Sequence, residues 1–113
     1  MFTSFRVGVR PWSDFVCECD PEYRSACVGE EFCGENQGKR YCVLHLPTAD
    51  KSQSFKNALD RKIQRRDFDF EGVWFPDDVD FTRFGFTDSD FTGATFNGNA
   101  TFSYANFPES AYF

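Results

Sequence analysis

Large apolar residues recur along the C-terminal part of the chain at steps that neither a helix nor an ordinary strand would produce. Phenylalanines occupy Phe70, Phe75, Phe81, Phe86, Phe91, Phe96, Phe102 and Phe107, and the next equivalent position holds Tyr112. The steps are five or six residues, whereas a helix repeats every ~3.6 residues and a strand every ~2. Both six-residue steps fall at the same place in a 21-residue unit. The pattern therefore predicts two coils of four short sides and the start of a third.

The size of neighbouring residues indicates how these coils would pack. In a strand, the residue two positions before each phenylalanine faces the same side as the ring. These residues are large in the first coil (Phe68, Val73, Val79, Phe84) and small in the second (Ser89, Ala94, Ala100, Ala105). We expect a mostly β solenoid over residues 67–113, with strands about 4.8 Å apart and a first coil that another element covers.

A helix that could cover the first coil precedes it, in the segment 47–66. Phe55, Leu59 and Ile63 form one apolar stripe at helical spacing, and Asp50 with Gln53 has the pattern of a capping box. Because an open solenoid end exposes apolar rings and unpaired strand edges, we expect this stripe to pack on the first coil as an N-terminal cap. A basic helix for nucleic acid or acidic lipid is the functional alternative.

The N-terminal part, residues 1–46, carries all five cysteines and the single histidine lies at its end. Cys27, Cys33, Cys42 and His45 have the spacing C-x5-C-x8-C-x2-H. Four thiolate or imidazole donors close a tetrahedral zinc site. A metal could also supply folding free energy to a segment with few aliphatic residues. We expect structural Zn²⁺ here, with disulfides or free thiols as the alternatives.

The ligand set itself remains open at the level of sequence. The C-x-C pair of Cys17 and Cys19 could replace Cys27 or Cys33 in the site. A catalytic zinc ion is not expected, because no second histidine and no general base accompany the cluster. The sequence also has no Gly-rich phosphate loop and no nucleophile elbow.

Charge divides the chain in a second way. The net charge is −6, and residues 67–113 carry nine acidic residues against one basic residue, Arg83. An acidic surface argues against direct binding to nucleic acid or anionic membranes. No apolar run approaches the ~20 residues of a membrane span, and the N-terminus has no signal-peptide pattern. We expect a cytoplasmic protein without a small-molecule substrate.

The segment DFTGATFNGNATFSYANF, from Asp90 to Phe107, resembles the pentapeptide-repeat family in its phenylalanine variant. The resemblance implies a right-handed quadrilateral β-solenoid. The cysteine segment is similar to small Cys3His modules ending in YC-x-x-H that precede pentapeptide repeats in some bacterial proteins. Trp74 and Gly85 depart from the family pattern, because they occupy positions where Asp or Asn is usual.

These features predict a non-enzymatic interaction or scaffold module, with a zinc-stapled base and an acidic solenoid. The alternative, implied by the resemblance, is a DNA mimic that binds a type II topoisomerase or another DNA-binding protein. Since an unpaired strand edge is a liability, we expect the C-terminal solenoid edge to pair with a protein partner, with a second copy as a homodimer, or with further solenoid in a longer chain.

Overall fold

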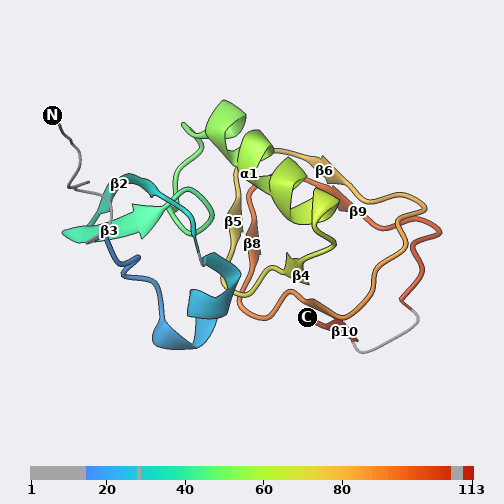
Figure 1. The fold of residues 1–113 in the computed structure, drawn as a ribbon. Coiled ribbons are helices and arrows are strands. Elements are labelled where there is room, and N and C mark those ends of the chain that lie inside the picture. The colour runs from blue at the N-terminus through green and yellow to red at the C-terminus, as the bar shows by residue number, and fades with distance from the viewer. Residues whose placement is uncertain (1–14, 28, 108–110) are drawn as a thin grey trace, which may run out of the picture.

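The computed structural model describes residues 15–27, 29–107 and 111–113, and it consists mostly of short strands with two helices (Figure 1). The first part comprises the 3-10 helix η2 (Pro21–Cys27) and the strands β2 (Phe32–Asn36) and β3 (Lys39–Cys42). Helix α1 (Ser52–Gln64) follows. The strands of the second part are β4 (Phe68–Asp69), β5 (Trp74–Phe75), β6 (Val79–Asp80), β7 (Ser89–Asp90), β8 (Thr95–Phe96), β9 (Ala100–Thr101) and β10 (Ala111–Tyr112).

Strands β2 and β3 form an antiparallel hairpin joined by a two-residue turn. Gln37 and Gly38 both have positive φ, at 51° and 80°, as a type I′ hairpin turn requires. The register is irregular between Phe32 and Gly34. The sequence does not predict this hairpin, because buried and exposed residues do not alternate along its strands.

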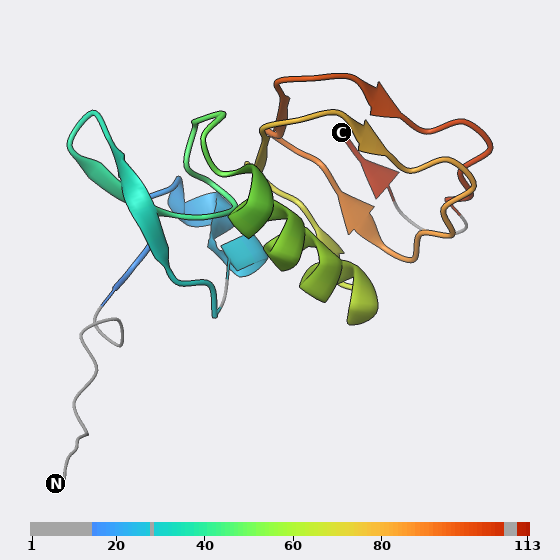
Figure 2. The same ribbon diagram turned by 90° about the horizontal axis from the view of Figure 1, so that it is seen from above.

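The second part is built from segments that pair in parallel with a segment one 21-residue unit further along the chain (Figure 2). Phe68 pairs with Ser89, Trp74 with Thr95 and Val79 with Ala100. An isolated parallel bridge joins Gly85 to Asn106 with the same offset. Strand β10 adds to β7 on its far side, giving the order β10-β7-β4.

The aromatic rings of paired segments stack on one another, in the interior of the second part of the chain. Ring centroids of Phe75 and Phe96 lie 4.6 Å apart, and those of Phe86 and Phe107 lie 4.8 Å apart with nearly parallel planes. The pairs Phe70–Phe91 and Phe81–Phe102 stack at 5.1 and 5.3 Å. The rings of the earlier segments are almost fully buried, so the 21-residue spacing places one aromatic residue over another along the stack.

The start of the third coil differs from the sequence expectation. Phe113, not Tyr112, stacks on Phe91, with centroids 5.0 Å apart. Tyr112 lies opposite Asp90 in the register and its side chain is 57% exposed. The step from β7 to β10 is 22 residues rather than 21, because Ala111 pairs with Ser89. This extra residue turns Tyr112 outward and makes Phe113 the residue that faces inward.

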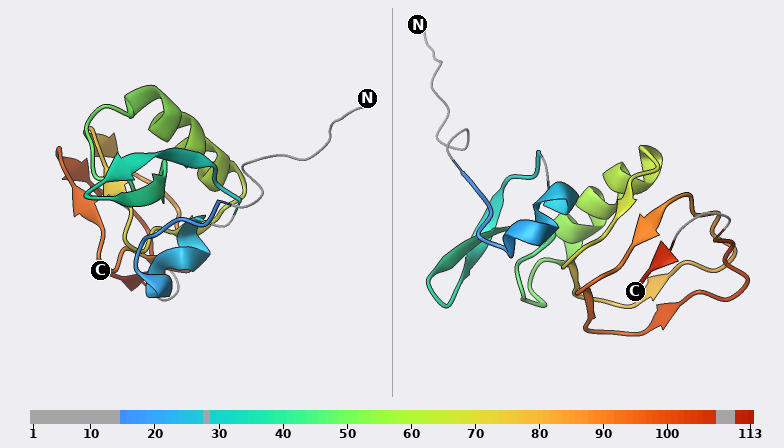
Figure 3. Two further views of the ribbon diagram at one scale, coloured as in Figure 1. Left: turned by 90° about the vertical axis from the view of Figure 1, so that its left-hand side faces the viewer. Right: turned by 90° about the horizontal axis from the view of Figure 1, so that it is seen from below.

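Helix α1 lies against the strands of the first coil (Figure 3). The residues of the predicted apolar stripe pack into the shared core. Phe55 is buried and its ring meets that of Phe75 edge to face at 5.3 Å, while Leu59 and Ile63 are partly buried against the same core. The capping box does not form. The N-cap residue is Lys51, it has no side-chain cap hydrogen bond, and the Gln53 side chain bonds to Asn57 instead.

The segment that follows β3 also covers part of the first coil, next to the helix. The Trp74 amide donates to the Leu44 carbonyl at 2.9 Å, just as the Thr95 amide of the next coil donates to Val73 at 2.9 Å. The backbone at Leu44 thus occupies the position of an earlier coil along this side. The apolar stripe predicts a cover made by the helix, and the segment after β3 adds to it.

Candidate metal centre

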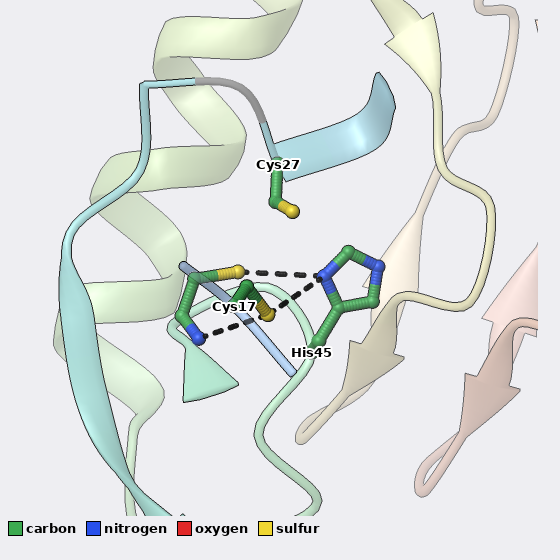
Figure 4. Close-up of side chains that lie close together, drawn as sticks. Cys17, Cys27 and His45 are labelled. Atoms are coloured by element: carbon green, nitrogen blue, oxygen red, sulfur yellow. Dashed lines mark hydrogen bonds between the residues drawn. The ribbon is translucent and has the colours of Figure 1, made fainter. Parts of the chain in front are cut away.

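Four donor side chains from the first part of the chain meet at one buried point: Cys17, Cys27, Cys42 and His45. Their ligand atoms, three sulfurs and one ring nitrogen, all lie within 4.8 Å of one another. His45 Nδ1 lies 3.4 Å from Cys42 Sγ and 3.9 Å from Cys17 Sγ. Figure 4 shows Cys27 and His45 approaching the same point from opposite sides. The group could hold a metal ion.

Three different backbone segments deliver these donors. Cys17 lies before η2 in a segment without helix or strand, where exposed and buried residues alternate from Val16 to Asp20. Cys27 ends η2, and Cys42 ends β3. His45 follows in a tight turn, in which the amides of His45 and Leu46 both donate to the Cys42 carbonyl. That turn places the C-x-x-H pair on one side of the backbone.

The predicted ligand set of Cys27, Cys33, Cys42 and His45 is corrected at one position. Cys33 lies on β2, is half-buried, and does not join the donor group, whose fourth member is Cys17. The Cys42 amide donates to Cys17 Sγ at 3.3 Å, which ties the two segments together. In the hairpin register Phe32, not Cys33, lies opposite Cys42. Spacing alone could not reveal this register, although Cys17 was one of the two alternative ligands.

The three thiols of the donor group shift one another's pKa values. Hydrogen bonds from the Cys27 and Cys42 thiols hold the pKa of Cys17 well below its usual range. The hydrogen bond to Cys17 raises the pKa of Cys27, and it raises the pKa of Cys42 to about 12. Cys17 is therefore the thiol of this group that loses its proton most readily. Because metals bind the thiolate form, metal binding would release the protons of Cys27 and Cys42.

The outer nitrogen of His45 is fixed by the second part of the chain. His45 Nε2 lies 2.8 Å from the Glu71 carbonyl oxygen, which can only accept, so Nε2 carries the proton and Nδ1 is left free to face the sulfurs. Metal-ligating histidines commonly donate their second N–H in this way. Glu71 follows β4, so the same ring touches both the donor cluster and the first coil.

Two buried lysines of the helix region support the loops that carry the donors, and no pattern in the sequence predicts their burial. Lys51 Nζ donates to the Val43 carbonyl at 2.6 Å, between Cys42 and His45. Lys62 Nζ donates to the Ala26 carbonyl at 3.1 Å, next to Cys27, and pairs with Asp67 at 3.0 Å. Both side chains are less than 5% exposed. Because they lie near the two ends of α1, their sequence positions alone suggest exposed charges.

The five cysteines all lie in described parts of the chain, and none forms a disulfide. Three soft sulfur donors and one imidazole match the ligand preference of zinc. Within the described ranges, no helix is both long enough and apolar enough to cross a membrane.

Comparisons with protein-family models, with curated proteins and with solved structures give no match for this chain.

Proposed function

We propose that this chain is a non-enzymatic protein-interaction module, in which a structural zinc ion bound by Cys17, Cys27, Cys42 and His45 holds an acidic β-solenoid on its base. The observation that carries the proposal is the position of His45. Its ring nitrogens face the donor cluster on one side and the Glu71 carbonyl on the other. A metal ion on Nδ1 would therefore fix the base to the first coil.

The metal centre has the composition of a structural site rather than a catalytic one. Four protein donors fill a tetrahedral zinc ion, whereas catalytic zinc keeps one position for water or substrate. All four residues are buried, with exposed fractions of 8% or less. When bound, the ion would hold three chain segments at fixed distances, and the buried Lys51 would offset part of the negative charge of three thiolates.

The second part of the chain is proposed to be a right-handed quadrilateral solenoid of the pentapeptide-repeat type. Parallel pairs with a 21-residue offset occur at four places along the coil, which supports four sides. The stacked phenylalanines fill the space between these sides, with centroids about 5 Å apart. A filled interior of this kind leaves the outer faces as the surface for binding.

Those outer faces are acidic, which favours a protein partner with a basic surface. Asp77, Asp80 and Asp88 are exposed on the solenoid. Asp69 lies opposite Asp90 in the β4–β7 register, so carboxylates repeat from coil to coil. Electrostatic recognition would make association faster at low salt than at high salt.

Hydrogen exchange before and after anaerobic zinc removal tests the zinc-stapled base. The Trp74 amide, which donates to Leu44, should exchange much faster in the metal-free protein, because the loop that carries Leu44 is no longer held. The Asn106 amide, which donates to Phe84 further along the coil, is the internal control. Equal protection of Trp74 with and without metal would contradict the proposal.

A DNA mimic remains the second candidate, because the Asp69–Asp90 pair repeats negative charge along the stack. Two coils at about 4.8 Å each span about 10 Å, whereas one turn of DNA is ~34 Å long. A supercoiling assay with a type II topoisomerase separates the two functions. Inhibition near equimolar protein would favour mimicry, and full activity at large excess would favour the interaction module.

A further inference from the structure

A fourth buried thiol, Cys19, is close in sequence to the first of the three thiols of the donor group. Cys19 is 6% exposed and follows Cys17 by two residues, with the exposed Glu18 between them. Cys17 and Cys19 are thus both buried on either side of Glu18, and Cys19 lies outside the group of four whose ligand atoms are within 4.8 Å of one another.

Cys19 and His45 also border the same opening to solvent. A depression of about 420 Å³ on the surface of the base is lined by both residues, together with Tyr23, Tyr41 and Gly72. His45 lines this depression, its Nδ1 faces the sulfurs of the cluster, and its Nε2 bonds to the Glu71 carbonyl. A rotation of the His45 ring away from the cluster would thus open the fourth position on the side where Cys19 lies.

We propose that Cys19 is a reserve ligand, which takes the fourth position from His45 and converts the centre from three thiolates and one imidazole to four thiolates. The inference rests on the metal centre proposed above and adds a second state to it. Thiolates are softer donors than imidazole, so the four-thiolate state favours thiophilic cations such as Cd²⁺ over Zn²⁺. The base would then respond to the identity of the bound metal, since only the imidazole state ties the ion to Glu71.

Cobalt binding by four anaerobically prepared proteins tests this ligand exchange. The proteins are the wild type and the variants His45→Gln, Cys19→Ser and the double variant His45→Gln/Cys19→Ser. Glutamine removes the imidazole ligand and keeps an N–H that can reach the Glu71 carbonyl. The His45→Gln protein should bind Co²⁺ with stronger thiolate-to-cobalt absorption than the wild type. The double variant should bind at least about tenfold more weakly than His45→Gln.

The controls separate this inference from the metal centre itself. Cys19→Ser alone should bind Co²⁺ as the wild type does, and so should Cys33→Ser, which removes a thiol outside the cluster. If the wild type does not bind Co²⁺, both the metal centre and the reserve ligand are wrong. If the wild type binds it and His45→Gln behaves like the double variant, only the reserve ligand is wrong.

A measurement without any change at His45 covers the case in which that variant does not fold. The wild type and Cys19→Ser are loaded with ¹¹³Cd²⁺ and compared by cadmium nuclear magnetic resonance. The wild type should give the chemical shift of a four-sulfur site, and Cys19→Ser the shift of a site with three sulfurs and one nitrogen. Identical shifts for the two proteins would overturn the proposal.

Discussion

Tyr23 lies across two glycines that occupy equivalent places in successive coils. Gly72 and Gly93 have φ values of 66° and 71°, a region that glycine enters at no steric cost. A Cβ atom built on either one would overlap the Tyr23 ring. Both the backbone angle and the close approach of this ring therefore require glycine, and Tyr23 fixes η2 against the coil.

The substitution Gly72→Ala should destabilise the protein by about 2 kcal/mol or more, because it adds left-handed strain and displaces Tyr23. Gly85→Ala is the matched control, since nothing lies within 4 Å of its added Cβ and its φ is not positive. That control should change the unfolding free energy by less than ~0.5 kcal/mol. Chemical denaturation measures both, and equal losses would contradict this account of Gly72.

Lys51 is a buried cation whose charge should be visible in the pH dependence of stability. Burial lowers the pKa of Lys51 from 10.5 to about 8 in the folded protein. Between these values the unfolded chain binds more protons than the folded chain, so the unfolding free energy rises with pH. The wild type should gain up to about 3 kcal/mol relative to Lys51→Met between pH 8 and pH 10.5. A constant difference between the two proteins over this window would contradict the shift.

At the scale of elements, helix α1 is amphipathic in an unusual way, since its covered side combines apolar residues with a buried lysine. Phe55 and Ala58 are buried with Lys62, and Lys62 reaches the carbonyl next to Cys27. The helix thus packs on the first coil and also bonds to a loop of the metal centre. A hydrophobic stripe predicts the first contact, but no periodicity in the sequence predicts the second.

Truncating the apolar side of α1 should therefore destabilise the stacked strands that the helix covers. Phe55→Ala removes a ring that meets Phe75 edge to face, and it should cost about 3 kcal/mol or more. Ser54→Ala, one residue earlier on the exposed side, should cost less than ~0.5 kcal/mol. Thermal unfolding of the two variants checks this, and a similar melting temperature for both would contradict the capping role.

Strand register was predictable for the coils and not for the base, for one physical reason. In the coils each side repeats after 21 residues, so the pairing of Phe75 with Phe96 follows from spacing alone. The third coil shows the limit of this rule. One added residue there shifts the register, so the side chain that stacks on Phe91 is Phe113 and not Tyr112. In the base no element repeats, so the sequence could name Cys17 as an alternative ligand but could not choose it over Cys33.

At the scale of the whole molecule, the base lies beside the stacked coils (Figure 3). The two parts meet through polar contacts as well as apolar packing. The Leu44 carbonyl accepts from Trp74, the Glu71 carbonyl accepts from His45, and Ser25 donates to the carboxylate of Asp69 at 2.6 Å. Two of these three contacts involve the segment from Cys42 to Leu46. A metal ion bound to Cys42 and His45 would hold that segment in place, and with it the first coil.

The metal content of three proteins purified without oxygen tests the central claim most directly. The wild type and Cys33→Ser should each carry about one zinc ion per chain, and Cys17→Ser should carry less than about half. This outcome would establish Cys17, Cys27, Cys42 and His45, rather than the set containing Cys33, as the ligands. Loss of zinc from Cys33→Ser with retention in Cys17→Ser, or a wild type with less than about half an ion per chain, would contradict the account.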